Sequence, residues 1–169
     1  AEELPAIRVN PKKSNGRVIV WIDKIGKQGI FDAQGNLRQP VQRMLEAGAS
    51  VVAVDLFGQG EFTADGKPMM RNRLNASDKE IKTHYAGYTY GYNYPLFSQR
   101  VHDILTLISA VQKSGTKPED IYVVGLGGAG HWIAAACAVA GSSIGGAAID
   151  TDGFRFATLT AIDDADFLP

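Results

Sequence analysis

Short apolar runs alternate along the chain with longer amphipathic stretches. The apolar runs are rich in β-branched residues and too short for free-standing helices; they cover residues 18–23, 50–55, 121–124 and 144–149. Runs of this kind are typical of strands that are covered on both faces. Residues 1–16 contain turn-forming residues and show no periodicity, so we interpret them as a lead-in to a domain over residues 17–169.

The segments between these runs have helical spacing. One helix is predicted from Pro40 to a stop at Gly48, and an alanine-rich helix over residues 131–140. In the longest helix, over residues 95–114, apolar residues recur every three or four positions, and Arg100 and Asp103 fall off the apolar face. Strands that alternate with helices predict an α/β fold, with a parallel sheet and helices on both faces.

Composition excludes several classes of partner. The 17 Lys and Arg residues are matched by 18 Asp and Glu, which leaves a net charge of −1 and no basic excess for nucleic acid. Apolar runs such as 133–140 are shorter than the roughly 20 residues of a membrane span, so we expect no membrane partner. The single cysteine, Cys137, excludes an internal disulfide and a multi-cysteine metal site. We expect neither a metal nor a cofactor.

A glycine-rich turn, G-L-G-G-A-G at 125–130, separates the third apolar run from the helix that follows it. One interpretation is the dinucleotide fingerprint G-x-G-x-x-G, which Gly125, Gly127 and Gly130 match letter for letter. Asp150 follows 20 residues after Gly130, at the end of the next predicted strand, where it could accept a hydrogen bond from a ribose hydroxyl. This alternative predicts an NAD-binding domain.

The second interpretation is the nucleophile elbow G-x-S-x-G, in which a strained turn projects a serine above the sheet. Gly125 and Ala129 occupy the small flanking positions, but the nucleophile position is Gly127, which has no side chain. The oxyanion half of such a site needs only backbone N–H groups. Gly128 could supply one, and the loop around 24–26, including Gly26, could supply another. Two strands and two helices precede the turn, and this order favours the elbow.

Other stretches add a family resemblance. Residues 54–61, V-D-L-F-G-Q-G-E, resemble the D-x-R-G-x-G stretch of α/β-hydrolases, with Phe57 where arginine is common, and 124–130 resembles V-G-x-S-x-G-G. Together with the segments 90–93, 96–105 and 148–156, the chain resembles bacterial α/β-hydrolases of the acetylxylan-esterase-like group over about residues 17–169. The resemblance implies a carboxylic or carbohydrate ester as substrate and an acyl-enzyme reaction through an activated serine.

The chain departs from this family in two ways. Gly127 replaces the nucleophilic serine, and the region expected to carry the catalytic histidine is absent. Asp150 and Asp152 are the candidates for the catalytic acid. We therefore expect the third to sixth strands of a longer parent protein, inactive as a serine esterase, with an extracytoplasmic location if the parent acts on polysaccharide. A third alternative is a non-catalytic module that binds carbohydrate or protein.

Aromatic residues supply the candidates for substrate binding. Tyr88, Tyr90 and Tyr92 alternate in the sequence, so in an extended segment they would share one face and could stack on sugar rings. Burial of the same residues against the sheet explains the same pattern, and we favour that interpretation. His131 begins the helix after the glycine turn and could face it, or could simply meet solvent.

Overall fold

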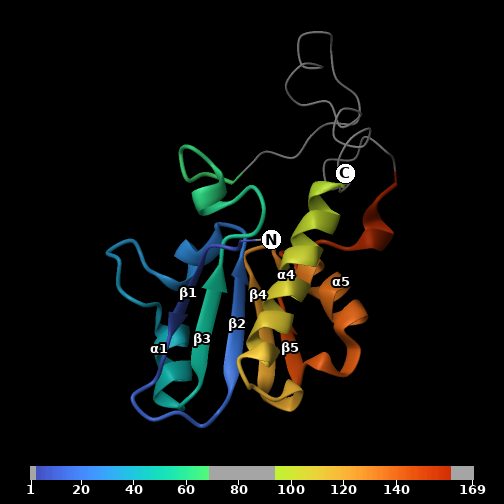
Figure 1. Cartoon of the computed structure of the whole chain (residues 1–169). Helices are drawn as coiled ribbons and strands as arrows, with labels where there is room; N and C mark the ends of the chain where they lie inside the picture. The colour runs from blue at the N-terminus through green and yellow to red at the C-terminus, as the bar shows by residue number, and fades with distance from the viewer. Residues whose placement is uncertain (1–2, 69–93, 161–169) are drawn as a thin grey trace.

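The computed structural model describes residues 3–68 and 94–160. Tyr88, Tyr90 and Tyr92 lie outside these residues. Within the described part, five strands form one sheet in the order β1-β3-β2-β4-β5 (Figure 1). The strands are β1 (Ala6–Val9), β2 (Val18–Asp23), β3 (Ser50–Val54), β4 (Ile121–Leu126) and β5 (Gly146–Ile149). The helices are α1 (Gln39–Glu46), α4 (Leu96–Lys113) and α5 (Gly130–Ala140), with short 3-10 turns that include η1 (Gly26–Ile30), η2 (Gly60–Phe62) and η5 (Phe156–Thr158).

Strands β2 to β5 are parallel, as predicted, and the α/β fold is confirmed. The sheet also contains a strand within the residues interpreted as a lead-in, because β1 pairs antiparallel with β3. Its four residues alternate between exposed and half-buried positions. A strand this short at the edge of a sheet needs only one covered face, so it lacks the continuous apolar run that marks β2 and β3.

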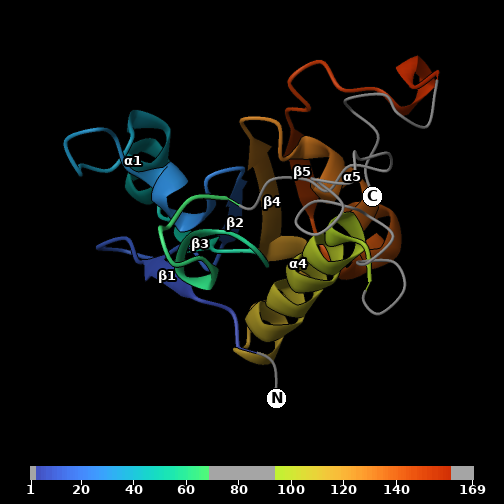
Figure 2. The same ribbon diagram turned by 90° about the horizontal axis from the view of Figure 1, so that it is seen from above.

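The helices cover both faces of the sheet, with α1 on one face and α4 with α5 on the other (Figure 2). The core on the α4–α5 face includes Val20, Ile22, Ile104, Ile108, Val123 and Ile133, and the core on the α1 face includes Trp21, Ile30, Val41, Val51 and Ala53. Neighbouring residues of β2 therefore serve opposite cores, because side chains alternate across a strand. None of the helices in residues 3–68 and 94–160 is long and apolar enough to cross a membrane.

Strand order places a topological switch point at the centre of the sheet. From β2 the chain continues through α1 to β3 on one side, whereas β4 pairs with the other side of β2 and leads into α5 on the opposite face. The loops after β2 and β4 therefore diverge above neighbouring strand ends. Open α/β sheets bind their ligands in the crevice at such a point.

Candidate functional site

The turn after β4 contains two glycines in the left-handed region of backbone space. Gly127 has a φ of +60° and Gly128 a φ of +86°, between the end of β4 at Leu126 and the start of α5 at Gly130. Residues with a side chain rarely adopt such φ angles, because the backbone is then strained. A nucleophile elbow imposes this strained conformation on its nucleophile. The turn therefore has the backbone sign expected of an elbow and glycine at the position of the reactive residue.

The outer glycines of the motif are closely packed, Gly125 against a side chain and Gly130 against backbone atoms. A Cβ atom at Gly125 would overlap the side chain of Ile133 in α5, and one at Gly130 would overlap the carbonyl oxygen of Asp150. Glycine at these two positions lets α5 approach both β4 and the chain that follows β5. Packing therefore favours glycine at 125 and 130, whereas the positive φ favours it at 127.

The segment after β5 is fastened to the turn through its backbone. The N–H of Gly130 donates to the carbonyl of Asp150 at 3.0 Å, and the N–H of Asp150 donates to the carbonyl of Gly125 at 2.9 Å. The Asp150 carboxylate accepts the N–H of Asp152 at 3.0 Å. Asp152 has a φ of +52°, and a Cβ at Gly128 would lie 3.6 Å from its Cβ. Of the two acidic candidates, Asp152 borders the turn directly.

A carboxylate that the sequence analysis did not identify lies on the other side of the turn. Asp23 ends β2 opposite Leu126 of β4, and it is 4% exposed. A Cβ at Gly127 would lie 3.4 Å from Asp23 Oδ1 and 3.8 Å from Lys24 Cγ. Asp23 and Lys24, rather than Gly26, are the loop residues recorded beside Gly127.

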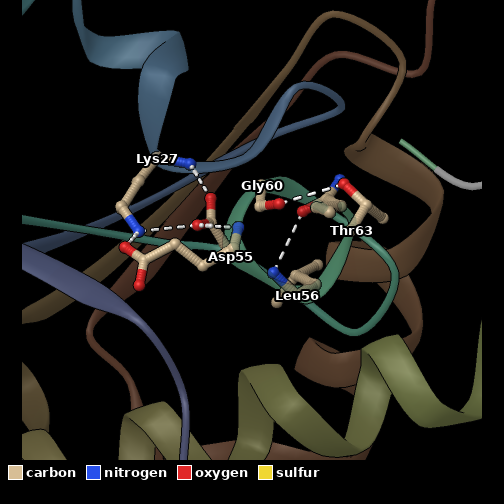
Figure 3. A network of polar contacts seen from close by, with 7 residues as sticks. Lys27, Asp55, Leu56, Gly60 and Thr63 are labelled. Carbon is tan, nitrogen blue, oxygen red and sulfur yellow. Dashed lines mark hydrogen bonds and ion pairs between the residues drawn. The ribbon is translucent and has the colours of Figure 1, made fainter. Parts of the chain in front are cut away.

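An ion-pair network, buried at Lys27 and Asp55 and exposed at Glu61, connects the loops after β2 and β3 (Figure 3). The carboxylate of Asp55 accepts the backbone N–H of Lys27 at 2.8 Å, Lys27 Nζ at 2.7 Å and the N–H of Glu61 at 3.1 Å. Lys27 Nζ also pairs with the Glu61 carboxylate. Burial alone lowers the pKa of Lys27, but its hydrogen bonds to Asp55 and Glu61 outweigh burial, and the net effect raises it.

The same loops meet through Gln59, which is fully buried. Its Nε2 donates to the carbonyls of Asp23 at 3.2 Å and Lys24 at 2.9 Å, and its Oε1 accepts the N–H of Leu56 at 3.0 Å. Gly26, the oxyanion candidate of the sequence analysis, packs so closely on Asp55 that a Cβ there would overlap the carboxylate. Asp55 and Gln59 therefore hold the loop of Asp23 in place.

Two charged residues of helix α4, which were predicted to lie off its apolar face, form hydrogen bonds with the loop after β3. The prediction did not extend to their burial: Arg100 and Asp103 are only 6% and 1% exposed. Asp103 accepts the N–H of Phe57 at 2.7 Å, and Arg100 Nε donates to the carbonyl of Phe57 at 3.1 Å. The Arg100 guanidinium also lies 4.5 Å from the ring centroid of Trp132. Burial lowers the pKa of Arg100 to about 10, although the Asp103 charge opposes this.

His131 lies within an aromatic cluster at the start of α5. Its ring stacks on Phe97 of α4 with centroids 5.9 Å apart, and Trp132 and Phe154 are 4.9 Å and 5.1 Å away. Phe156 of η5 extends the cluster and is 60% exposed. Because Phe154 follows Asp152 in the segment that borders the glycine turn, the cluster forms a neighbouring apolar surface. The interpretation of His131 as a substrate contact stays a prediction.

Two further features of the described residues concern the binding of metals and ligands. Within residues 3–68 and 94–160, no group of three or more His, Cys, Asp or Glu residues is placed to hold a metal ion. An open surface hollow of about 670 Å³ lies beside the loop after β2, lined by residues that include Ile25, Phe31 and Arg38. Arg38 Nη1 is 3.9 Å from Asp23 Oδ2, so one lining residue of the hollow lies beside Asp23.

Comparison with known proteins supports the fold and not a specific activity. No family model matches the chain, and no curated protein does. A solved prolyl endopeptidase superposes on 85% of this chain with a TM-score of 0.54 and 18% identity, over 18% of its own length. A probable hydrolytic enzyme from Pseudomonas aeruginosa gives 0.48 and 20% identity, and a carboxylesterase from Bacillus cereus gives 0.45 and 14%.

The last two superpositions include 83% and 78% of this chain, but only 34% and 52% of the two enzymes. These structures share the α/β-hydrolase fold. The superposition on the prolyl endopeptidase shows that the chain has this fold, over a part of that enzyme's length. At identities of 20% or less, the likeness establishes the fold alone.

Proposed function

We propose that this chain is an α/β-hydrolase-type domain of the carboxylic or carbohydrate ester hydrolase group that binds its ligand without forming a serine acyl-enzyme. The observation that carries the proposal is Gly127, which holds a φ of +60° at the elbow position and offers no hydroxyl. The N–H of Gly128 has no acceptor among residues 3–68 and 94–160, so a ligand carbonyl could accept it there.

The described residues also supply no evident general base for an elbow nucleophile. His102 is exposed on α4, and the ring of His131 stacks on Phe97. Asp23 is beside Gly127, but the base that takes the proton of a catalytic serine is normally a histidine. We therefore expect that Gly127→Ser alone restores no burst of acylation. A measurable burst in this variant would mean that a base exists elsewhere in the protein.

Aryl acetate turnover and fluorophosphonate labelling test the proposal together. We expect neither above the level of a Gly127→Ala control, which removes the unusual conformational freedom of the turn and adds no nucleophile. Steady turnover with labelling of one residue of the wild-type protein would contradict the proposal. Measuring both distinguishes an acyl-enzyme from slow background hydrolysis at the protein surface.

The dinucleotide alternative makes a different demand on the same turn. A pyrophosphate needs free N–H groups at the start of the helix. At the start of α5 the N–H groups of Ala129 and Gly130 already donate to the carbonyls of Leu126 and Asp150, which leaves those of Gly127 and Gly128 in the preceding turn. We expect calorimetric titration with NADH to be silent. Binding that disappears in Asp150→Ala would replace our proposal with the NAD-binding alternative.

A further inference from the structure

The surface hollow beside the loop after β2 is a ligand site candidate that is separate from the glycine turn. Its volume of about 670 Å³ lies within the range of small-molecule pockets, roughly 300–1,000 Å³. All of its lining residues lie between positions 25 and 38, in η1 and the loop that leads to α1. A ligand in this hollow would therefore contact a different part of the chain from the turn at 125–130.

The loop that forms one wall of the hollow is held in shape by its own hydrogen bonds. Asp32 Oδ1 accepts the N–H groups of Gln34 at 2.9 Å and Asn36 at 2.8 Å. The N–H of Asp32 donates to the carbonyl of Asn36 at 2.8 Å, and Phe31 pairs with Leu37 in an antiparallel bridge. The wall is thus formed before a ligand binds, which lowers the entropic cost of association.

The apolar part of the lining comes mainly from Ile25 and Phe31. Ile25 is 39% exposed, although Gly26 and Lys27, which follow it, are buried. The N–H of Ile25 donates to Asp23 Oδ1 at 3.2 Å, so the backbone of this exposed isoleucine is fixed. Phe31 is half-buried. An isoleucine side chain and a phenyl ring in one lining suit an apolar group of a ligand, because both remove apolar surface from water.

Arg38 and Asp32 bring opposite charges to the same lining, and they form no ion pair with each other within residues 3–68 and 94–160. Arg38 Nε donates to the carbonyl of Phe31 at 3.0 Å, which sets the orientation of the guanidinium. Arg38 Nη1 is 3.9 Å from Asp23 Oδ2, beyond hydrogen-bond range. In the described part of the chain, neither Nη atom of Arg38 donates a hydrogen bond, and Asp32 Oδ2 accepts none.

These charges select the kind of ligand. An anion without a positive group would be repelled by Asp32, and a cation without a negative group by Arg38. The carbonyl that Arg38 Nε contacts belongs to Phe31, the residue directly before Asp32, so the two charged residues are neighbours in the lining. A ligand that matches them carries an ammonium and a carboxylate close together, and an apolar group beside them.

We propose that the hollow binds an apolar α-amino acid in its zwitterionic form. The carboxylate accepts hydrogen bonds from the Nη groups of Arg38, whose planar fork matches a carboxylate. The ammonium donates to Asp32 Oδ2, and the apolar side chain packs on Ile25 and Phe31. This inference goes beyond the proposed function and does not depend on it, because the ester of that proposal binds at the glycine turn.

Titration of the isotopically labelled protein with L-phenylalanine, followed by NMR, tests the inference. A ligand of this size should bind with roughly millimolar affinity. We expect saturable shifts of the Ala33 and Gly35 amide signals, both in the lining, and of the Arg38 Nε–H signal. Phenylalaninamide lacks the carboxylate and N-acetylphenylalanine lacks the ammonium. Each should bind about threefold to tenfold more weakly, the loss expected for a charged hydrogen bond that is partly exposed to water.

Two variants assign the two charged contacts. Asp32→Asn keeps an oxygen for the N–H groups of Gln34 and Asn36, so the loop should keep its shape, and it should remove the preference for L-phenylalanine over N-acetylphenylalanine. Arg38→Gln should remove the preference over phenylalaninamide. The matched control is Arg43→Gln, at an exposed position of α1, which should bind all three compounds like the wild type.

Each outcome decides the matter. No saturable shift in the wild-type protein, or largest shifts outside residues 25–38, would overturn the inference even if a variant fails to fold. Equal affinity of the wild type for L-phenylalanine and its two analogues would also overturn it. A folded Arg38→Gln or Asp32→Asn variant that keeps both preferences would contradict the assigned contacts. All of these results leave the proposed function standing, because that proposal is tested by acylation and NADH binding at the glycine turn.

Discussion

The substitution Lys27→Met tests whether the buried ion pair holds the two loops of the site. Lys27 and Asp55 have side chains that are 9% and 1% exposed, with Nζ and Oδ2 2.7 Å apart. Methionine keeps most of the volume but leaves the Asp55 carboxylate buried with only its two backbone donors, Lys27 N and Glu61 N. Removing one partner of a buried pair costs about 3–5 kcal/mol, which is a large part of the roughly 5–15 kcal/mol that stabilises a typical domain.

The assay is urea unfolding followed by tryptophan fluorescence. Trp21 and Trp132 are both buried, one in each core, so they report on both faces of the sheet. We expect the midpoint to fall without a change in the slope, and the melting temperature to drop by roughly 6–20 °C. The matched control is Lys24→Met, an exposed lysine in the same loop, with a change within about 0.5 kcal/mol. A loss below about 1 kcal/mol in Lys27→Met would refute the claim that this pair fixes the loops.

Three further changes test other parts of the account. The pKa of Lys27 is raised above 10.5 in the folded protein, so the contribution of Lys27 to the free energy of unfolding should be complete below pH 10.5 and lost as the pH rises through that folded-state pKa. The stabilities of the wild type and Lys27→Met, measured by urea unfolding, should therefore converge at high pH. A difference that stays constant with pH would contradict this. Gly130→Ala should cost about 1–3 kcal/mol because its Cβ overlaps the Asp150 carbonyl, and a neutral effect in thermal melting would show that α5 can move away. Arg100→Lys should lower the free energy of unfolding by about 1–2 kcal/mol, because lysine has no Nε to donate to the carbonyl of Phe57 and stacks poorly on Trp132. An unchanged melting temperature would show that these two contacts do not stabilise the protein.

The central part of the fold could be predicted from the sequence because its signals are local. The run V-I-V-W-I-D predicts β2 with the observed limits, and the helical spacing predicts α4 to within a residue at each end. Strand β1 could not be found in this way. Its four residues alternate weakly, and its stability comes from pairing with β3, more than 40 residues further along the chain.

The local geometry of the glycine turn could be anticipated from the sequence, whereas its neighbours could not. The glycine turn can be recognised from its own residues. Gly127 adopts a positive φ, and Gly130 lies too close to the Asp150 backbone to carry a Cβ atom. Asp23 carries no such signal, because an aspartate after an apolar run is ordinary until β4 places Gly127 beside it. The burial of Arg100 and Asp103 depends likewise on the Phe57 backbone, which helical periodicity does not encode.

The central claim is that the turn after β4 binds an ester without forming an acyl-enzyme, because Gly127 offers no hydroxyl. One NMR sample of the labelled protein with an acetylated xyloside tests it most directly. We expect the amide signals of Gly127 and Gly128 to shift on addition while the acetyl signal of the ligand stays unchanged during prolonged incubation. Release of free acetate faster than in a protein-free sample, or an unmoved Gly128 signal at saturating ligand, would contradict the account.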